Sequence, residues 1–149
     1  MTSLKHRLTI TCLAFVAGCG SEPNDGVFGT YTLVGVEASP LPYLVSSDAE
    51  CDLLISLGEL TLVQDGTYTL EFSGPHDCTK SGGQVATIGR FYTGTFTQAG
   101  NAVTFEAEVQ GAGTLGFSGT ANPLEAFVTV PPIPPATGPD LRLQFAIIQ

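Results

Sequence analysis

Apolar and polar residues alternate with a period of two over most of this 149-residue chain, and that alternation is what most constrains its fold. In the stretch GELTLVQDGTYTLEF, one face carries Leu60, Leu62, Tyr68, Leu70 and Phe72, whereas most of the intervening residues are threonine or charged. Neighbouring side chains of a β-strand point to opposite faces, so the pattern predicts strands with one dry and one wet face. Antiparallel sheets commonly have this division, with one face on a core and the other in water.

Eight or nine strands of this kind can be placed along the chain. NAVTFEAEV repeats the alternation, with Val103, Phe105, Ala107 and Val109 inward and Thr104, Glu106 and Glu108 outward. Turn signals stand between strands at Asp65-Gly66, Ala99-Gly100-Asn101, Gly111-Ala112-Gly113 and Asn122-Pro123. The predicted strands are Phe28–Glu37, Leu41–Ser46, Glu59–Gln64, Thr67–Ser73, Thr87–Thr97, Ala102–Val109, Thr114–Thr120, Leu124–Val130 and Leu141–Ile148. The second can merge with the first across a kink at Pro40–Pro42, and Leu53–Leu57 fits a short turn or a strand equally well.

The order of these strands predicts an all-β fold, an antiparallel up-and-down β-barrel of eight or nine strands. Consecutive hairpins favour that arrangement, and closure removes exposed strand edges, which otherwise pair with other chains. The strand glycines Gly89, Gly94, Gly116 and Gly119 are interpreted as bulges or bends that curve the barrel. The segment PPIPPATGP, Pro131–Pro139, is predicted to be a stiff extended loop, because proline lacks the backbone donor of a ladder.

The N-terminus is typical of an export signal. Lys5–Arg7 is basic, and the apolar stretch Leu8–Ala17 is shorter than the roughly 20 residues that span a bilayer. The quartet Val16-Ala17-Gly18-Cys19 resembles the lipobox of bacterial lipoproteins. That resemblance implies a signal peptide over residues 1–18 and lipidation of Cys19, with a diacylglycerol on its thiol and an acyl chain such as palmitate on its amine. An ordinary signal peptide that is cut nearby is the alternative.

A lipid on Cys19 predicts attachment to the bacterial cell envelope, because several acyl chains anchor a protein stably. Residues 19–27 are then a flexible tether, which the polar stretch Gly20–Gly26 suits. Gly20, rather than an aspartate, follows the cysteine, and in the lipoprotein family this favours the outer membrane, facing the periplasm or the cell surface.

The charge of the chain argues against binding to nucleic acid. Without residues 1–18, which contain Lys5 and Arg7, three basic residues stand against 14 acidic ones, a formal charge of −11. Such a surface repels nucleic acid and anionic lipid headgroups. The remaining 131 residues fit one domain.

The cysteine count agrees with export. Cys12 leaves with the signal and Cys19 is lipidated, so Cys51 and Cys78 remain as a pair, 27 positions apart, for which an oxidising compartment predicts a disulfide. A metal site is the competing interpretation, because His76, Asp77 and Cys78 lie together and Asp48, Glu50 and Asp52 surround Cys51. No paired CxxC, paired histidine or EF-hand spacing supports a metal, so we expect no metal and no cofactor, and these acidic residues are interpreted as a solvated loop.

Three stretches, FGTYTLVGVEASPLP, LTLVQDGTYTLEF and GTFTQAGNAVTF, together resemble the small lipocalin-like lipoproteins of bacteria. The resemblance implies a lipocalin-like barrel over residues 28–149. Gly29-Thr30-Tyr31 matches the Gly-x-Trp of the first lipocalin strand, with tyrosine in place of tryptophan. The family often closes one barrel end with an arginine of the last strand stacked over that aromatic residue, and Arg142 is the candidate by position. A plain surface charge is the alternative interpretation of Arg142.

No constellation of residues predicts catalysis. After export only His76 remains as a histidine, and no G-x-S-x-G elbow is present. Glu106 and Glu108 form a carboxylate pair, but the alternation places both on the outer face, where a solvated strand explains them better than acid–base chemistry does. We therefore expect a protein that is not an enzyme.

The predicted inward side chains leave two functional readings open. Leu33, Leu62, Leu70, Phe72, Phe105, Phe117, Phe127 and Phe145 describe either a filled core or the lining of a cavity for a small hydrophobic ligand. A filled core predicts an envelope interaction or structural module whose protein partner is unknown, and a cavity predicts a carrier. A protease-inhibitor-like barrel is a further alternative. A membrane-spanning barrel is disfavoured, because threonine and glutamate occupy the face that lipid would touch.

Overall fold

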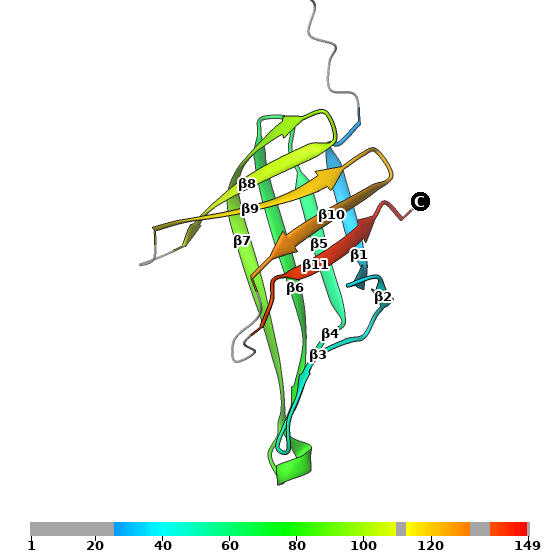
Figure 1. Cartoon of the computed structure of the whole chain (residues 1–149), viewed down its shortest axis with the longest axis vertical. Helices are drawn as coiled ribbons and strands as arrows, with labels where there is room; N and C mark the ends of the chain where they lie inside the picture. Colours follow the sequence, from blue (N-terminus) through cyan, green and yellow to red (C-terminus); the bar gives the residue numbers. More distant parts are fainter. Residues whose placement is uncertain (1–25, 110–112, 132–137, 149) are drawn as a thin grey trace, which may run out of the picture.

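Antiparallel strands dominate the computed structural model, which describes residues 26–109, 113–131 and 138–148 (Figure 1). The elements are β1 (Gly29–Val36), β2 (Ser39–Pro40), β3 (Tyr43–Ser47), β4 (Asp52–Ile55), β5 (Leu57–Leu62), β6 (Thr67–Asp77), the 3-10 helix η1 (Thr79–Ser81), β7 (Val85–Ala99), β8 (Ala102–Val109), β9 (Gly113–Ala121), β10 (Glu125–Val130) and β11 (Leu141–Ala146). Within the described residues, no helix has the length and apolar character needed to cross a membrane.

Eight of the strands close into a barrel. From β5 to β11 each barrel strand pairs with the next one along the chain, and β1 pairs with both β5 and β11. Every pairing around this ring is antiparallel. The prediction of an all-β, up-and-down, lipocalin-like barrel is therefore confirmed. An eight-stranded ring leaves an interior that side chains can fill or that can hold one small ligand.

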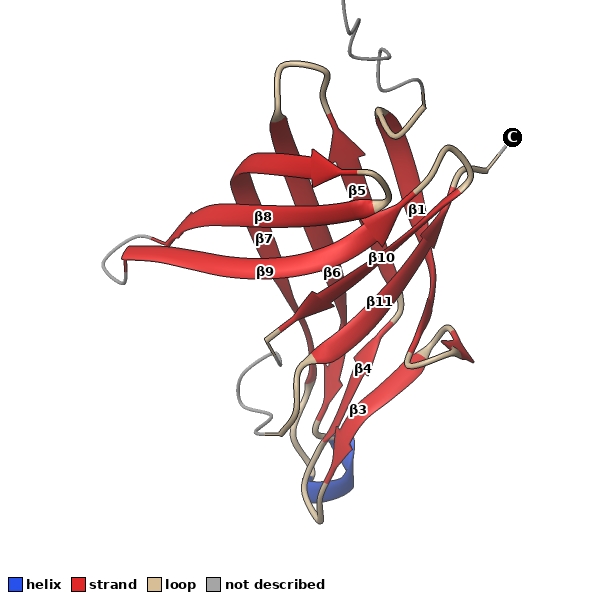
Figure 2. Cartoon of the chain, turned by 45° about the horizontal axis from the view of Figure 1, so that its top comes forward, coloured by secondary structure: helices blue, strands red, loops and turns tan. Residues whose placement is uncertain are grey.

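Three short strands lie outside the ring, and two of them belong to a projecting arm (Figures 1 and 2). β6 continues past β5 and pairs with β4, which pairs in turn with β3. β7 accompanies β6 over the whole length of β6, as far as the pair Asp77–Val85. We call β3, β4 and the adjoining ends of β6 and β7 the arm. Its tip consists of residues 47–52 and 76–84, and the tip includes η1.

The core lies on the ring axis and obeys the predicted alternation. Leu60 and Leu62 of β5, Tyr68, Leu70 and Phe72 of β6, and Val103, Phe105 and Ala107 of β8 are all buried. Thr104, Glu106 and Glu108 are exposed, as the alternation predicts. Exclusion of these inward side chains from water is the main force that stabilises the ring.

The arm is where the strand boundaries differ from expectation. Leu53 and Ile55 of the undecided stretch lie in strand β4, and both are buried, so packing favours the extended form over a turn. The predicted strand Leu41–Ser46 is replaced by β2 and β3, which a cis Leu41–Pro42 peptide bond separates. β6 runs beyond Ser73 through Pro75, because that proline lies between the ladder to β5 and the ladder to β4 and so interrupts neither.

The turn at Asp65-Gly66 forms where it is predicted but by a different mechanism. Only Gly66 has a positive φ, of 84°. Asp65 instead fixes the turn with its carboxylate, whose Oδ1 accepts hydrogen bonds from the backbone N–H (2.9 Å) and the hydroxyl (2.6 Å) of Thr67. An aspartate that bonds the chain two residues ahead is a common turn device.

Close approach of neighbouring strands explains three of the four strand glycines, and a Cβ on Gly89 would lie 2.7 Å from the carbonyl oxygen of Phe72. A Cβ on Gly94 would lie 2.0 Å from the carbonyl oxygen of Glu106, and one on Gly119 would lie 2.1 Å from that of Phe127. Any side chain at these three positions would push adjacent strands apart. Gly116 has no such contact, since the nearest atom to a Cβ there is 4.0 Å away.

Truncation of Phe105 tests whether the ring axis holds the main core. Phe105 is 1% exposed, whereas Phe91 on the outer face of β7 is 62% exposed. Phe105→Ala should lower the free energy of unfolding by about 3–5 kcal/mol, because it removes a fully packed aromatic side chain. The matched control Phe91→Ala should change it by no more than about 0.5 kcal/mol. Urea unfolding followed by far-ultraviolet circular dichroism measures both, and equal losses would contradict this assignment of the core.

Candidate functional site at the tip of the arm

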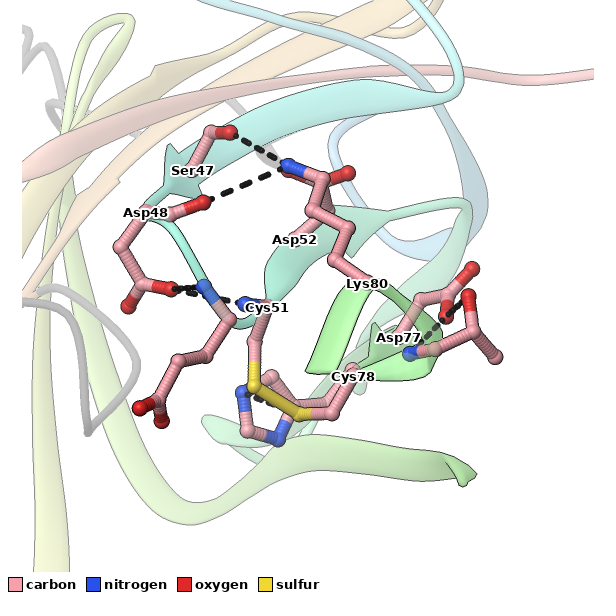
Figure 3. Close-up of polar contacts among 10 residues, drawn as sticks. Ser47, Asp48, Cys51, Asp52, Asp77, Cys78 and Lys80 are labelled. Atoms are coloured by element: carbon pink, nitrogen blue, oxygen red, sulfur yellow. Dashed lines mark hydrogen bonds and ion pairs between the residues drawn. A yellow bond between two sulfur atoms is a disulfide. The ribbon is translucent and has the colours of Figure 1, made fainter. Parts of the chain in front are cut away.

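A disulfide between Cys51 and Cys78 links the two halves of the tip (Figure 3). Cys51 ends the loop between β3 and β4, and Cys78 directly follows β6. The pairing agrees with the prediction from the cysteine count. It ties together two segments that are 27 residues apart, at the end of the arm where no barrel core supports them.

Asp48 shapes the loop that carries Cys51. Its Oδ1 accepts hydrogen bonds from the backbone N–H groups of Cys51 (2.7 Å) and Glu50 (2.8 Å), and its own N–H donates to the Cys51 carbonyl (3.0 Å). These donors favour the ionised carboxylate, so the N–H of Cys51, followed by that of Glu50, lowers the pKa of Asp48. Hydrogen bonds to both the N–H and the carbonyl of Cys51 therefore fix its position.

Asp77 does the same for the segment that carries Cys78. Its Oδ1 accepts from the hydroxyl (2.7 Å) and the N–H (2.9 Å) of Thr79, and these bonds lower the pKa of Asp77, the hydroxyl first. The Cys78 carbonyl then accepts from the N–H groups of Ser81 (3.2 Å) and Gly83 (3.0 Å). The Asp-x-Thr device repeats that of Asp65 and Thr67, so this pattern was a signal available in the sequence.

Lys80 of η1 joins the two halves a second time. Its Nζ donates to Ser47 Oγ (3.0 Å), to the Asp48 carbonyl (3.4 Å) and to Asp52 Oδ1 (2.5 Å). The hydrogen bond from Lys80 is the main cause that lowers the pKa of Asp52. Both side chains are solvent-exposed enough that the ion pair contributes little free energy, but it fixes where η1 sits against β3 and β4.

The acidic residues of the tip are therefore more than a solvated loop. Asp48, Asp52 and Asp77 each hold a defined hydrogen bond within the tip. Glu50 contributes its backbone N–H and is exposed. The sequence pattern did not reveal Lys80 or Ser47, because their contacts join segments about 30 residues apart.

His76 lies beside the disulfide. Its Nε2 is 3.7 Å from Cys78 Sγ, and one ring nitrogen and both sulfur atoms lie within 4.8 Å of one another. All three side chains are half-buried. The pairing of His76 with Leu53 across β6 and β4 holds the imidazole there. Three residues of the competing metal interpretation, Cys51, His76 and Cys78, thus come together in space, although the two cysteines are oxidised to a disulfide.

Aromatic rings occupy the middle of the barrel, the other candidate site. Phe105 packs against Tyr68 and Phe117, with ring centroids 4.9 and 5.1 Å apart, and Tyr92 lies 5.5 Å from Phe117. The Tyr68 hydroxyl is buried without a hydrogen-bond partner among the described residues, and burial raises its pKa. Such edge-to-face and stacked contacts hold the rings in a fixed arrangement.

The side chains along the axis leave almost no surface for water. Leu60, Leu70 and Phe145 are 0% exposed, and Tyr68 and Phe105 are 1% exposed. A side chain that lines a void large enough for a water molecule keeps some surface that water can touch. These five side chains therefore border no such void, which is the property of a filled core.

Seven of the eight predicted inward residues lie in this core, and Phe127 does not. Ala126, Val128 and Val130 are the buried residues of β10, so Phe127 points to the outer face and is half-buried. Apolar residues occur on both faces of β10, so the sequence does not show which face is inward. The pairing of β10 with β9 and β11 determines this.

Arg142 stacks on Phe127 rather than on Tyr31, which corrects the predicted barrel-closing pair. Its guanidinium carbon lies 4.6 Å from the Phe127 ring centroid. Leu141 and Leu143 point inward, so Arg142 between them must point outward. Its carbonyl accepts from the Glu37 N–H, far along the barrel from Tyr31.

Tyr31 closes its end of the barrel with backbone partners. The buried hydroxyl donates to the Val27 carbonyl at 2.6 Å and lies 3.1 Å from the Asn122 carbonyl. Burial raises its pKa. The contacts that seal this end of the barrel are therefore made by the Tyr31 hydroxyl.

Two shallow grooves mark the outer face of the barrel. One, of about 230 Å³, is lined by threonines and by Glu106 and Glu108, which are both exposed as predicted. The other, of about 250 Å³, lies between Leu57 and Phe91, with Ser73 and Gly89 in its lining. Leu57 and Phe91 are among the most exposed large apolar side chains of the described residues.

Comparisons with known proteins identify no family for this chain. No protein-family model matches the chain, and neither a curated protein nor a solved structure matches it. Cys19 lies outside the residues that the structure describes, so its lipidation stays a prediction from the sequence.

Removal of the disulfide tests its part in stability. Cys51→Ser should lower the free energy of unfolding by about 3–4 kcal/mol, since a bridge that closes a loop of this length restricts the unfolded chain by that amount. Thermal unfolding under oxidising conditions measures the loss. A reductant should destabilise the wild type to the level of the variant and leave the variant unchanged. An unaltered melting temperature in Cys51→Ser would contradict a stabilising role.

Proposed function

We propose that this protein is a lipid-anchored module of the bacterial cell envelope, with a filled and non-catalytic barrel that presents the arm to a partner in the aqueous space. The observation that carries the proposal is the axis of the barrel, where Leu60, Tyr68, Leu70, Phe105 and Phe145 are 0–1% exposed. A carrier of the lipocalin kind needs a cavity of several hundred cubic ångströms, and packing of this density leaves none beside those side chains.

The placement of the chain ends supports an outward-pointing arm. Gly26 lies against Pro123 in the turn between β9 and β10, at the end of the molecule opposite the tip (Figure 1). Seven peptide units join Cys19 to Gly26, and they can span at most about 25 Å. A lipid on Cys19 would therefore keep the Tyr31 end of the barrel near the membrane and direct the tip of the arm away from it.

The outer surface supports an interaction role over a catalytic one. Leu57 and Phe91 flank a groove with Glu71 and Arg90 in its lining, and exposed apolar side chains with charged neighbours are typical of contact surfaces. Glu106 and Glu108 line a separate open groove on a solvated strand face. Open exposure of this kind gives a carboxylate no reason to become a general acid.

Substitution of Cys19 tests the anchor on which the location depends. The full chain should fractionate with membranes of the expressing bacterium, and Cys19→Ser should move it to the soluble fraction of the envelope, because no thiol remains to receive the lipid. Cys12→Ser is the matched control, since it changes a cysteine that leaves with the signal, and it should stay with the membrane.

Mass spectrometry of the purified chain gives the second readout of the same test. A wild-type N-terminal peptide that begins at Cys19 and carries acyl chains is the expected result. An unmodified Cys19 and equal fractionation of the two cysteine variants would overturn the proposed anchor.

A further inference from the structure

Among the described residues, two cysteine sulfurs and an imidazole converge at the tip of the arm, and the function proposed above gives this group no role. Cys51 Sγ, Cys78 Sγ and a ring nitrogen of His76 all lie within 4.8 Å of one another. They come from two separate parts of the chain, the loop before β4 and the end of β6. In the oxidised protein the two sulfurs bond to each other, and only the imidazole is free to bind a metal.

We propose that reduction of the Cys51–Cys78 disulfide converts the tip into a Zn²⁺ site, with two thiolates and the His76 imidazole as protein ligands and a water in the fourth position. Thiolate and imidazole are the ligands that Zn²⁺ prefers, at about 2.3 Å from sulfur and 2.0–2.1 Å from nitrogen. Tetrahedral Zn–S bonds of that length place two sulfurs about 3.8 Å apart. His76 Nε2 already lies 3.7 Å from Cys78 Sγ, and the two sulfurs, which are bonded to each other in the disulfide, would move apart by side-chain rotation after reduction.

The structure around the three donors is built to hold them without the disulfide. Asp48 accepts hydrogen bonds from the N–H groups of Glu50 and Cys51. Asp77 and Thr79, which bond to each other, fix the chain on either side of Cys78. His76 lies within the ladder between β6 and β4. Lys80 joins the two halves of the tip independently of the sulfurs. The donors therefore stay close together when the S–S bond is broken.

The local charge favours a cation. Asp48, Asp52 and Asp77 are within three positions of the two cysteines in the chain, and Lys80 is the basic residue whose side chain forms an ion pair with one of them, Asp52. Bound Zn²⁺ would balance the two thiolates and meet an acidic surrounding. The tip of the arm is also its most distant part from the barrel core, so the change of state leaves the ring intact.

The exchange between the two states balances with an external thiol–disulfide couple. A dithiol or two monothiols reduce the bridge, giving two cysteine thiols and an external disulfide, and both thiols lose their protons when Zn²⁺ binds. In reverse, an external disulfide accepts two electrons from the two thiolates and two protons from water. It becomes two thiols, while the Cys51–Cys78 bond forms and Zn²⁺ is released. The tip thus binds zinc only when its surroundings are reducing.

Cobalt binding tests this site directly. The full chain carrying Cys12→Ser and Cys19→Ser retains Cys51 and Cys78 as its only thiols. After reduction with a phosphine and its removal without oxygen, it should bind one Co²⁺ per chain. The expected signature is thiolate-to-cobalt charge transfer with intense d–d bands of a tetrahedral ion, which Zn²⁺ should then abolish by displacement. The oxidised chain should give neither signal.

His76→Ala separates a built site from chance binding by two thiols. The substitution should weaken Zn²⁺ binding at least about tenfold, the lower limit seen for loss of even an outer-sphere partner. His6→Ala is the matched control and should leave the affinity unchanged. Far-ultraviolet circular dichroism of the reduced proteins checks that the barrel persists.

Oxidation supplies the final readout. Addition of a small-molecule disulfide to the zinc-loaded chain should release Zn²⁺ to a chromogenic indicator as the bridge re-forms. Absence of the charge-transfer band in the reduced chain, or equal affinity in His76→Ala, would overturn the site. This result is independent of the membrane anchor, because the Cys19 fractionation test does not involve the tip.

Discussion

The pairing of β1 with β11 is the interaction on which the structure depends, because it closes the barrel. It joins Leu33 to Phe145 and Val36 to Leu143, residues more than 100 positions apart, while the other edge of β1 pairs with β5. Without this ladder the ring would be an open sheet with two free edges and an uncovered apolar face. With it, the inward side chains of all eight barrel strands meet on one axis and exclude water.

The arm follows from the same strands. β6 and β7 are long enough to leave the barrel together, and the edge of β6 that β5 no longer covers is taken by β4. The arm has less core beneath it than the ring has, so its tip depends on covalent and polar links: one disulfide, one lysine and a set of aspartate turns. Burial of apolar side chains stabilises the barrel, whereas the disulfide and the polar contacts stabilise the tip.

Alternation made most of the barrel predictable, and the failures have a physical cause. In β6 and β8 the large apolar residues occupy only one set of positions, so the inward face follows from the sequence. In β10 both sets of positions carry apolar residues. The small Ala126 faces the interior, where it fits opposite Phe145, and the larger Phe127 therefore points to the outer face. Arg142 then finds Phe127 as its diagonal neighbour across the β10–β11 ladder, a contact that depends on register.

The candidate site was half predictable for a similar reason. Cysteine parity identified the disulfide, and the cluster of acidic residues around it was visible in the sequence. The contacts of Lys80 with Ser47 and Asp52 were not, because they depend on how β4 attaches to β6, and no local pattern encodes that. Strand β4 itself was ambiguous in the sequence because it has only four residues, and its extended form depends on pairing with β6.

A crystal of the protein pressurised with xenon is the most direct measurement of the central claim, that the barrel interior is solid. Xenon enters dry apolar cavities and is located by its scattering. A solid interior leaves no place for xenon on the barrel axis between Leu60, Tyr68, Phe105 and Phe145. An ordered xenon atom among those four side chains would contradict it and would restore a ligand carrier as the better interpretation.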